Sequence, residues 1–459
     1  MDENLQQAVS EFLQRADSGN RLTMDECEIF LNKIPGFTDK HGVEDTREFL
    51  DFLGSPEKNI PIIHVAGTNG KGSVCSYISS ALVKADYSVG MFTSPHLVKL
   101  NERFAIDGKP ISEGVFVEVF TEALRRVVEY GRDDYFPTYF ELLFFVAMIL
   151  YDVYPVDYLI LETGLGGRLD ATNVVENPIL TVITEIGYDH MQYLGTTIED
   201  IAAEKAGIIK PGVPVVFFDK RPESSEVIRK RALELNCRAV AVESRNIENV
   251  TVERDDTGNK YIAFSYNSLY DKYADLRLAT EARYQAENGA VAVTCLELLR
   301  EMGGRISELD IRQGLLCAKW EGRMEEISPG IYLDGAHNLD GIEAFLESVS
   351  CIECEGRKLL LFGIVGDKEY KDIIYKILES RQFDSILVAT LATERSVSVS
   401  DLKIAFEDSK DELGIIGLPI KYYSNVRDAV TDIITMRKSG DMLFAAGSLY
   451  LVGQVKSLV

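Results

Sequence analysis

Short β-branched segments alternate with helical patterns from about residue 60, and this alternation restricts the chain to a small set of folds. Strands and helices that follow each other in this way form βαβ units, in which helices cover a parallel sheet. The pattern predicts strands at 60–65, 88–92, 158–161, 179–184 and 213–218, and helices at 71–85, 113–130, 140–151 and 198–206. We therefore expect an α/β protein with a mostly parallel sheet.

The pattern changes once and then restarts. Short alternating runs around a DDTGN turn at 245–275 predict a small antiparallel β element, and a long helix follows at about 281–302. After about residue 320 the βα alternation resumes for a stretch long enough to bury its own core. We predict two α/β domains, residues 1–305 and a smaller Rossmann-like domain at 306–459.

Composition excludes several classes of function. Lys and Arg number 48 against 73 Asp and Glu, a formal net charge of −25, which argues against a dedicated binder of nucleic acid or of anionic membranes. The longest apolar run, 142–151, is too short to span a bilayer, and the acidic start does not resemble a signal peptide. Seven irregularly spaced cysteines are typical of reduced thiols, and the single CxxC at 351–354 has no second pair. We expect a cytoplasmic protein.

The sharpest motif is HVAGTNGKGSV at 64–74. A predicted strand ends at Ala66, a glycine-containing loop turns, and Lys71 opens a helix. In a P-loop the backbone N–H groups and the helix N-terminus bind phosphates, and the lysine reaches the β- and γ-phosphates. The motif departs from GxxxxGK[ST], because Gly72 separates Lys71 from Ser73. The alternative is a glycine-rich turn without a ligand.

Acidic and histidine side chains follow two further predicted strands. Glu162 directly follows the strand at 158–161, at the carboxyl end of the sheet, where an acid in a P-loop protein typically serves Mg²⁺. Asp189 and His190 follow the strand at 179–184. An acid at the end of a strand can also be an ordinary surface residue. The residue types alone do not distinguish a metal-ligating role for His190 from a structural one.

Three other clusters stand out. Ser94 and His96 lie on a turn after the strand at 88–92, and the turn at 334–338 (DGAHN) follows Arg323, a residue suited to bidentate contact with a phosphate. Lys205 lies late on a predicted helix beside Glu204. Such a charged pair usually forms a solvated face, and periodicity gives it no special role.

Together these blocks resemble the folylpolyglutamate synthase/dihydrofolate synthase family, relatives of the Mur ligases. The matching stretches occur in the family's order from about residue 30 to the C-terminus: HVAGTNGKGSV, FTSPHLVKLNER, TYFELL, ETGLGGRLDATN, DHMQYLG, AAEKAGIIKPG and DGAHN. The Mur ligases share the P-loop and the glutamate but not TSPHL or GGRLDATN. The resemblance implies a P-loop Mur-ligase-like N-terminal domain and a C-terminal glutamate-ligase domain.

Carried over by position, the resemblance implies four groups of site residues. For ATP they are Asn69, Gly70, Lys71, Gly72, Ser73, Asn288, Arg323 and Asp334; for Mg²⁺ they are Ser94, Glu162 and His190. Near the pterin-bearing substrate they are Thr138, Arg168, Leu169, Asp170 and Ala171. The implied catalytic residues are Lys71, His337, which faces the incoming glutamate, and Lys205, which matches the family's carbamylated lysine.

The implied reaction is the ATP-dependent addition of L-glutamate to the carboxylate of a pteroate or folate. The carboxylate attacks the γ-phosphate to give an acyl phosphate, and the amine of glutamate then forms the amide. The resemblance implies a monomer that binds small molecules. Two other readings stay open: a Mur-type ligase for a nucleotide-linked sugar acid, and a P-loop ATP-binding module without ligase activity.

Four positions depart from the family's pattern. Asp86 stands where glycine is usual, Glu321 where proline is usual, Tyr284 where histidine is common and Tyr188 where leucine is common. None of these changes removes an implied catalytic group.

Overall fold

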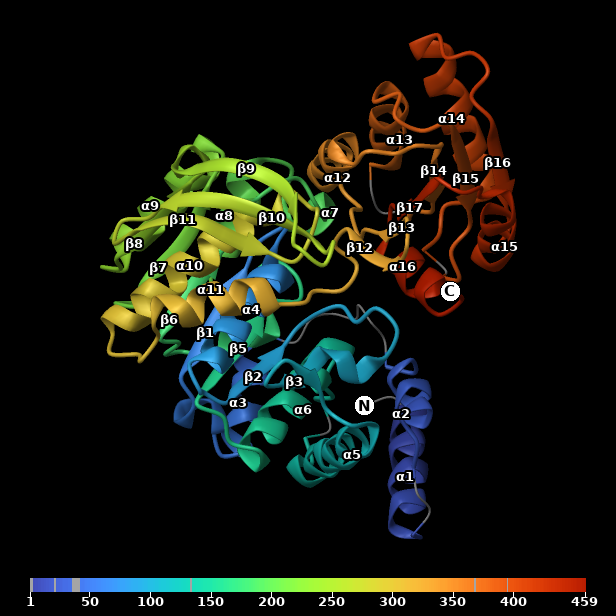
Figure 1. The fold of residues 1–459 in the computed structure, drawn as a ribbon. Coiled ribbons are helices and arrows are strands. Elements are labelled where there is room, and N and C mark those ends of the chain that lie inside the picture. Colours follow the sequence, from blue (N-terminus) through green and yellow to red (C-terminus); the bar gives the residue numbers. More distant parts are fainter. Residues whose placement is uncertain (1–2, 20–21, 35–41, 133, 367–368, 394) are drawn as a thin grey trace. The chain divides into compact units, whose positions relative to one another are not determined.

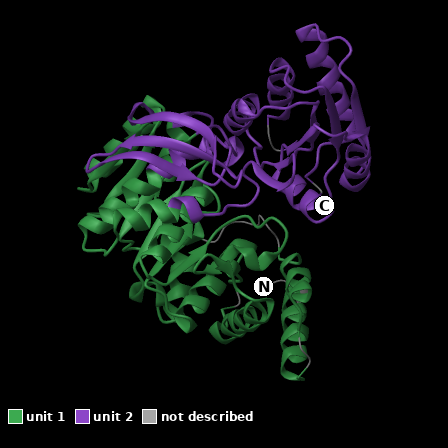
Figure 2. Ribbon diagram, viewed as in Figure 1, with its two compact units in different colours: residues 1–186, 199–243, 291–314 green, residues 187–198, 244–290, 315–459 purple. Residues whose placement is uncertain are grey.

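The computed structural model describes residues 3–19, 22–34, 42–132, 134–366, 369–393 and 395–459 (Figure 1). It is an α/β fold, as the alternating pattern predicts. The chain divides into two compact units (Figure 2): residues 1–186, 199–243 and 291–314 form the first, and residues 187–198, 244–290 and 315–459 form the second. The units interleave along the sequence, so the continuous domains 1–305 and 306–459 stay a prediction.

The first unit is built on an eight-stranded sheet of order β4-β3-β2-β5-β1-β6-β7-β8. The six neighbouring strands β2, β5, β1, β6, β7 and β8 pair in parallel, and β3 and β4 add an antiparallel edge next to β2. The five predicted strands are confirmed to within two residues. The strands are β1 (Ile62–Ala66), β2 (Val89–Phe92), β3 (Phe104–Ile106), β4 (Lys109–Pro110), β5 (Tyr158–Glu162), β6 (Leu180–Ile183), β7 (Val215–Asp219) and β8 (Ala239–Glu243).

Helices of the first unit pack on this sheet and on one another. Helix α4 contacts β1, β2 and β5, whereas α5 packs on α6 and also contacts α1 and α2. The helices are α1 (Glu3–Asp17), α2 (Met24–Leu31), α3 (Val43–Phe52), α4 (Lys71–Lys84), α5 (Glu113–Tyr130), α6 (Tyr139–Val153), α8 (Ile198–Ala206, from its second residue on) and α9 (Pro222–Glu234). The predicted bounds of α5 and α8 are confirmed without a shift.

The longest apolar run of the sequence, residues 142–151, lies in α6. A capping box between Thr138 and Glu141 begins the helix, and nine of the ten run residues are buried. The run is therefore core of the first unit. Within the part of the chain that the structure describes, no helix is long and apolar enough to cross a membrane.

The second unit contains two sheets. The predicted antiparallel element is confirmed as a three-stranded sheet of order β11-β10-β9, and the restarted alternation forms a six-stranded sheet of order β12-β13-β17-β14-β15-β16. In the larger sheet β12 alone among these strands runs antiparallel to its neighbour. The strands are β9 (Ile247–Arg254), β10 (Lys260–Asn267), β11 (Lys272–Leu278), β12 (Glu325–Ser328), β13 (Ile331–Leu333), β14 (Lys358–Phe362), β15 (Ser385–Ala389), β16 (Ile420–Tyr423) and β17 (Met442–Ala446).

Alternate residues of β14 supply the two faces of the six-stranded sheet. Leu360 and Phe362 join a core cluster with α12, α13 and α14, and α15 contacts β14, β15 and β16. The helices are α7 (Met191–Leu194), α12 (Leu339–Cys351), α13 (Tyr370–Glu379), α14 (Val399–Leu413), α15 (Val426–Met436) and α16 (Leu449–Lys456). Helices α10 (Gln285–Glu301) and α11 (Glu308–Cys317) contain residues of both units.

The strand order of the first unit places its loops for ligand binding. The chain leaves β1 toward β2 on one side of the sheet, and it leaves β6 toward β7 on the other. The carboxyl ends of β1 and β6 therefore flank a topological switch point, where ligands of open α/β sheets bind.

Asp86 stands in the turn before β2, where the family usually has glycine. Its φ of 61° is a left-handed conformation that glycine adopts easily and aspartate tolerates.

Candidate active site

The loop between β1 and α4 has the backbone of a phosphate-binding turn. Gly67 and Gly70 have φ values of 153° and 86°, and a Cβ on Gly67 would lie 1.8 Å from the Thr184 hydroxyl. Glycine at Gly70 leaves the first turn of α4 without a side-chain cap. The N–H groups of this turn have no acceptor within the helix and can donate to an anion. The predicted strand–loop–helix is confirmed.

Lys71 folds back over this loop. Its Nζ donates to the carbonyl oxygens of Gly67 (3.1 Å) and Thr68 (3.3 Å) and lies 4.0 Å from Oε1 of Glu162. The Lys71 side chain is 18% exposed and that of Glu162 is 4% exposed. The end of β5 thus brings the predicted acid beside the predicted phosphate-binding lysine.

The turn after β2 meets the same acid. The backbone N–H of Ser94 donates to Oε2 of Glu162 at 3.0 Å, next to the cis peptide bond between Ser94 and Pro95. Nδ1 of His96 accepts a hydrogen bond from Nε of Arg103 at 2.9 Å. Burial first, and the Arg103 charge second, lower the pKa of His96 to about 3. His96 is therefore neutral and bound to arginine.

Lys205 is buried, which contradicts the solvated helical face that periodicity favours. Only 3% of the residue is exposed, and its Nζ donates to the Gly67 carbonyl at 2.8 Å. The neighbouring Glu204 instead forms an ion pair with Arg168 at 2.7 Å. Tertiary contacts therefore separate two residues that are adjacent in sequence, and the Gly67 carbonyl accepts hydrogen bonds from both Lys71 and Lys205.

The loop at 163–174 contains four of the five residues that resemblance places near the substrate. The buried Asp170 carboxylate accepts hydrogen bonds from the N–H groups of Gly164, Leu165 and Thr172 and from the Thr172 hydroxyl. Asp170 thus shapes the loop from inside, and burial raises its pKa. Leu169 is 49% exposed, and Ala171 begins the short 3₁₀ turn that follows. The fifth residue, Thr138, caps α6.

Sequence reasoning missed three residues that support these loops. The Thr184 hydroxyl donates to the Asn69 carbonyl at 2.7 Å, and Nε2 of His64 lies 2.8 Å from the Thr172 hydroxyl. The Thr172 proton is donated to Asp170, so His64 must be the donor to Thr172. The Glu185 carbonyl accepts from the N–H groups of the loop at 68–69. A position at or just after a predicted strand was the available signal for Thr184 and Glu185.

In the second unit, the segment after β6 and the 334–338 turn come together. Oδ2 of Asp189 lies 3.5 Å from Nε2 of His337 and accepts a hydrogen bond from the Asn338 amide at 3.4 Å. Nδ1 of His337 donates to the Gly335 carbonyl at 2.7 Å. His190 has φ 50° and its Nε2 lies 3.8 Å from Oδ1 of Asp189. One buried carboxylate therefore faces both predicted site histidines.

The three nucleotide residues expected from this unit have internal partners. Asp334 is buried and accepts from the Tyr284 hydroxyl (2.7 Å) and from backbone N–H groups. Burial raises the pKa of Asp334, and the charge of Arg323 opposes that shift. Nη1 of Arg323 donates to the Gly322 carbonyl, and the Asn288 amide donates to Gln285.

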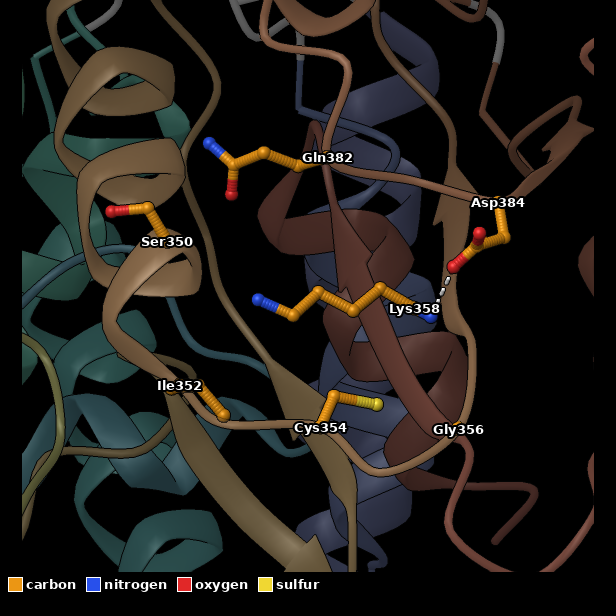
Figure 3. Close-up of a pocket in the computed structure, with 7 residues that line it drawn as sticks. All are labelled: Ser350, Ile352, Cys354, Gly356, Lys358, Gln382 and Asp384. Carbon is orange, nitrogen blue, oxygen red and sulfur yellow. Dashed lines mark hydrogen bonds between the residues drawn. The ribbon is translucent and has the colours of Figure 1, made fainter.

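A pocket of about 410 Å³ lies elsewhere in the second unit (Figure 3). It is at the amino ends of β14 and β15, where Lys358 donates through its backbone N–H to Asp384 and through Nζ to the Val349 carbonyl. Ligands of open α/β sheets bind at the carboxyl ends, so this pocket is not part of the candidate site. Its Cys354 is a free thiol that contacts the carbonyls of Arg357 and Gly440.

Metal-ligating side chains are sparse. Among the residues that the structure describes, no three or more His, Cys, Asp or Glu side chains form a group that could hold a metal ion. A cation at this site would therefore need hydroxyl, phosphate or water oxygens in addition to Glu162.

Comparisons with known proteins identify the fold. Residues 65–296 match the Mur ligase middle domain, and residues 322–449 match the glutamate ligase domain of Mur ligases. Two solved structures are similar over 95% of this chain: the folylpolyglutamate synthase of Mycobacterium tuberculosis complexed with ADP (27% identity, 98% of that chain, TM-score 0.83) and E. coli FolC in complex with DHPP and ADP (29% identity, 97% of that chain, TM-score 0.80).

Sequence relatives agree with these matches. The dihydrofolate synthase/folylpolyglutamate synthase of Bacillus subtilis is 37% identical over 427 residues, which cover 91% of this chain and 94% of the relative. The folylpolyglutamate synthase of Lacticaseibacillus casei is 32% identical over 76% of this chain and 81% of its own length. Because both Mur ligase domains match and these relatives are at least 32% identical over three quarters or more of the chain, the chain belongs to the dihydrofolate synthase/folylpolyglutamate synthase family of Mur-type, ATP-dependent ligases.

Proposed function

We propose that this chain joins L-glutamate to the carboxylate of a pteroate or folate, using ATP and an acyl-phosphate intermediate. The observation that carries the proposal is the approach of Lys71 Nζ to Glu162 Oε1, 4.0 Å, at the carboxyl ends of β1 and β5. A cation suited to phosphate and an acid suited to a metal ion are thus adjacent beside an uncapped helix N-terminus.

ATP phosphates would bind the loop and first turn of α4. Gly70 and Gly72 supply backbone N–H groups there and Ser73 supplies a hydroxyl. The N–H of Asn69 already donates to the Glu185 carbonyl, so Asn69 would contribute its side-chain amide. Lys71 would exchange its carbonyl contacts for phosphate oxygens. Arg323, Asn288 and Asp334 are proposed nucleotide ligands as well. Their side chains offer a planar cation, an amide and a carboxylate, which suit phosphate, base and hydroxyl groups respectively.

Glu162 and Ser94 fit a Mg²⁺ ion, because the ion prefers oxygen ligands and takes few of them from protein. The N–H of Ser94 is 3.0 Å from Oε2 of Glu162, so the serine hydroxyl belongs to a residue next to this carboxylate. His190 is proposed as a further ligand by resemblance. When bound, Mg²⁺ neutralises charge on the transferring phosphoryl group.

The proposed reaction has two steps. The substrate carboxylate oxygen attacks the γ-phosphorus of ATP, the bond to the ADP oxygen breaks, and Lys71 stabilises the charge on the phosphoryl oxygens. The glutamate amine then attacks the acyl carbon, releasing phosphate and a proton. The Nδ1–H of His337 donates to Gly335, which leaves Nε2 as the atom able to take up that proton.

The loop at 163–174 is proposed to contact the pterin-bearing substrate. Leu169 and Arg168 are the exposed candidates, whereas Asp170, Ala171 and Thr138 would act mainly through the shape of the loop and of the α6 N-terminus. An exposed leucine beside a planar apolar ligand would lose water-accessible apolar area on binding.

A carbamate on Lys205 remains a hypothesis from resemblance. The buried Nζ donates to the Gly67 carbonyl, and a carbamate would keep one N–H on this nitrogen for the same hydrogen bond. Carbamylation therefore requires only that the two carbamate oxygens point away from this carbonyl. Activity of Lys205→Ala restored by added short-chain carboxylates would support the carbamate, and full activity without them would contradict it.

The function is tested by ADP release with ATP, Mg²⁺ and glutamate, run in parallel with dihydropteroate and with tetrahydrofolate. Turnover with both substrates indicates a bifunctional synthase, and turnover with one indicates a dedicated enzyme. ATP binding without glutamate-dependent release from either substrate would contradict the proposal. We further propose a cytoplasmic monomer, which light scattering of the purified chain would check for oligomeric state.

A further inference from the structure

Residues 281–284, between β11 and α10, are tied to the strand and turn that present Asp334. Glu281 accepts a hydrogen bond from the hydroxyl of Tyr332 in β13, Ala282 lies in the core cluster of the six-stranded sheet, and Tyr284 donates to Asp334. All of these residues belong to the second unit. Four consecutive residues thus contribute three separate attachments.

The first attachment is a triad of Lys260, Glu281 and Tyr332, and Oε2 of Glu326 lies beside it, 3.8 Å from Nζ of Lys260. Nζ of Lys260 donates to Glu281 Oε2 at 2.8 Å and to the Tyr332 hydroxyl at 2.5 Å, and that hydroxyl donates to Glu281 Oε2 at 2.8 Å. Burial and the Glu281 charge raise the pKa of Tyr332, so it remains a phenol. Opposite charges with shared hydrogen bonds hold one geometry better than an exposed pair does.

The second attachment sets the orientation of the Asp334 carboxylate. Oδ2 accepts from the Tyr284 hydroxyl at 2.7 Å and from the Met324 N–H at 2.9 Å, and Oδ1 accepts from the Ala336 N–H at 2.8 Å. A carboxylate has about four acceptor positions. The described residues therefore fill both positions of Oδ2 and one of Oδ1, which leaves Oδ1 one position for a hydroxyl or amino donor of a ligand.

We propose that Tyr284 is a positioning residue for Asp334 and that the Lys260–Glu281–Tyr332 triad holds Tyr284 in place. The inference rests on the proposed role of Asp334 in nucleotide binding. The χ2 torsion of aspartate is broad, so a carboxylate with one donor fewer on Oδ2 can rotate and offer a different oxygen to the ligand. Tyr284 acts on the nucleotide only through this carboxylate.

The direct test is the steady-state kinetics of Tyr284→Phe, which removes one hydroxyl and keeps the ring. We expect KM for ATP to rise roughly 10-fold, the usual effect of losing one hydrogen bond to a charged group, with KM for glutamate and kcat within about twofold of wild type. Tyr423→Phe is the matched control. It removes another hydroxyl–aspartate hydrogen bond, to Asp432, in the same unit and should leave KM for ATP unchanged.

The triad is tested by a double-mutant cycle with Glu281→Gln. If Glu281 acts through Tyr284, each single variant raises KM for ATP and the double variant is no worse than Tyr284→Phe alone. Independent, multiplying effects on KM for ATP would overturn the role of the triad. Lys260→Met provides the same cycle if Glu281→Gln does not fold, as judged by thermal unfolding.

Asp334→Asn separates this inference from the function on which it rests. A raised KM for ATP in Asp334→Asn with an unchanged value in Tyr284→Phe would refute the positioning role alone. An unchanged KM for ATP in Asp334→Asn would instead refute the assignment of Asp334 to the nucleotide. A general loss of folding would lower the melting temperature and kcat without singling out ATP.

Discussion

The loops after β1 and after β13 have the same layout, but they differ in whether the helix that follows is capped at its N-terminus. Each follows a parallel strand at its carboxyl end and leads into a helix, α4 or α12. Gly70 leaves the N-terminus of α4 uncapped, whereas the Asn338 side chain accepts from the Gly341 N–H at 2.8 Å and caps α12. The N–H groups of an uncapped helix N-terminus can donate to an anion, whereas a capping side chain already accepts a hydrogen bond from one of them.

The charged residues of the two loops follow the same division. The first loop holds Lys71 and Lys205 against one backbone carbonyl, whereas the second holds the buried carboxylate of Asp334 among N–H and O–H donors. Carbonyl oxygens are weak partners for an ammonium group compared with a phosphate, so the lysines can change partner. Asp334 keeps its donors and can only add one. The comparison suggests a loop made to receive anions and a loop made to present a fixed acceptor.

Among these variants, Lys71→Ala should have the largest effect, because it removes the cation of the first loop. Loss of one charged donor to a transition state costs roughly 10² to 10³ in rate, and Lys71 is also expected to bind the ground-state phosphates, so we expect kcat/KM for ATP to fall about 10³-fold. Lys84→Ala, at the exposed end of the same helix, is the control and should keep wild-type turnover. Substantial residual ADP release by Lys71→Ala, with a folded protein, would contradict the P-loop assignment.

The strands that precede the two loops should differ in how they make the free energy of unfolding depend on pH. β1 contains the fully buried His64, whose pKa burial lowers to about 3, whereas β13 contains Tyr332, which stays protonated. Unfolding raises the His64 pKa to its ordinary value near 6.5, so the unfolded chain binds a proton that the folded chain rejects. Stability from His64 is complete above pH 6.5 and is lost as the pH falls toward 3.

His64→Gln tests this contribution, because its amide can still donate to the Thr172 hydroxyl. Between pH 6.5 and pH 5 the wild-type free energy of unfolding should fall by about 2 kcal/mol more than that of the variant. Denaturant titrations of both proteins at several pH values measure the difference. Parallel pH profiles would show that folding does not lower the His64 pKa.

Asn338→Ala should remove the cap of α12 and lower the free energy of unfolding by about 1 kcal/mol. Asn425 caps α15 in the same way, at 2.9 Å from the Asp428 N–H, so Asn425→Ala should cost a similar amount. Asn338 also contacts Asp189, and we expect only its variant to lower kcat. Equal kinetics for the two variants would reduce Asn338 to a structural cap.

Glu204→Gln should have the smallest effect. Its partner Arg168 is largely exposed, and exposed ion pairs contribute less than about 1 kcal/mol, so thermal unfolding should change little. Asp170→Asn, in the same loop, is the contrasting variant because its carboxylate is buried with four donors. If Glu204→Gln and Asp170→Asn lower the free energy of unfolding equally, the distinction between the exposed Glu204–Arg168 pair and the buried Asp170 carboxylate would be wrong.

Local signals located the secondary-structure elements well. The bounds of α5 and α8 and the start of α4 at Lys71 follow from periodicity and from glycine positions, and the predicted strand at 158–161 is one residue shorter than β5. Lys205 shows where such signals fail. Its neighbours in sequence favour solvent, and its burial depends on the Gly67 carbonyl 138 residues away. Tyr284 was visible only as a departure from a family pattern.

The amino-acid sequence alone indicates the βα order, the two glycines that turn the loop between β1 and α4, and the family to which the chain belongs. These properties depend on residues close together in the chain, where propensity and backbone sterics act directly. The tertiary structure decided which charges are buried and what each one contacts: Lys205 on Gly67, Asp189 on His337, and Tyr284 on Asp334. Those contacts join segments that are far apart in the sequence, so the residues around each one do not indicate its partner.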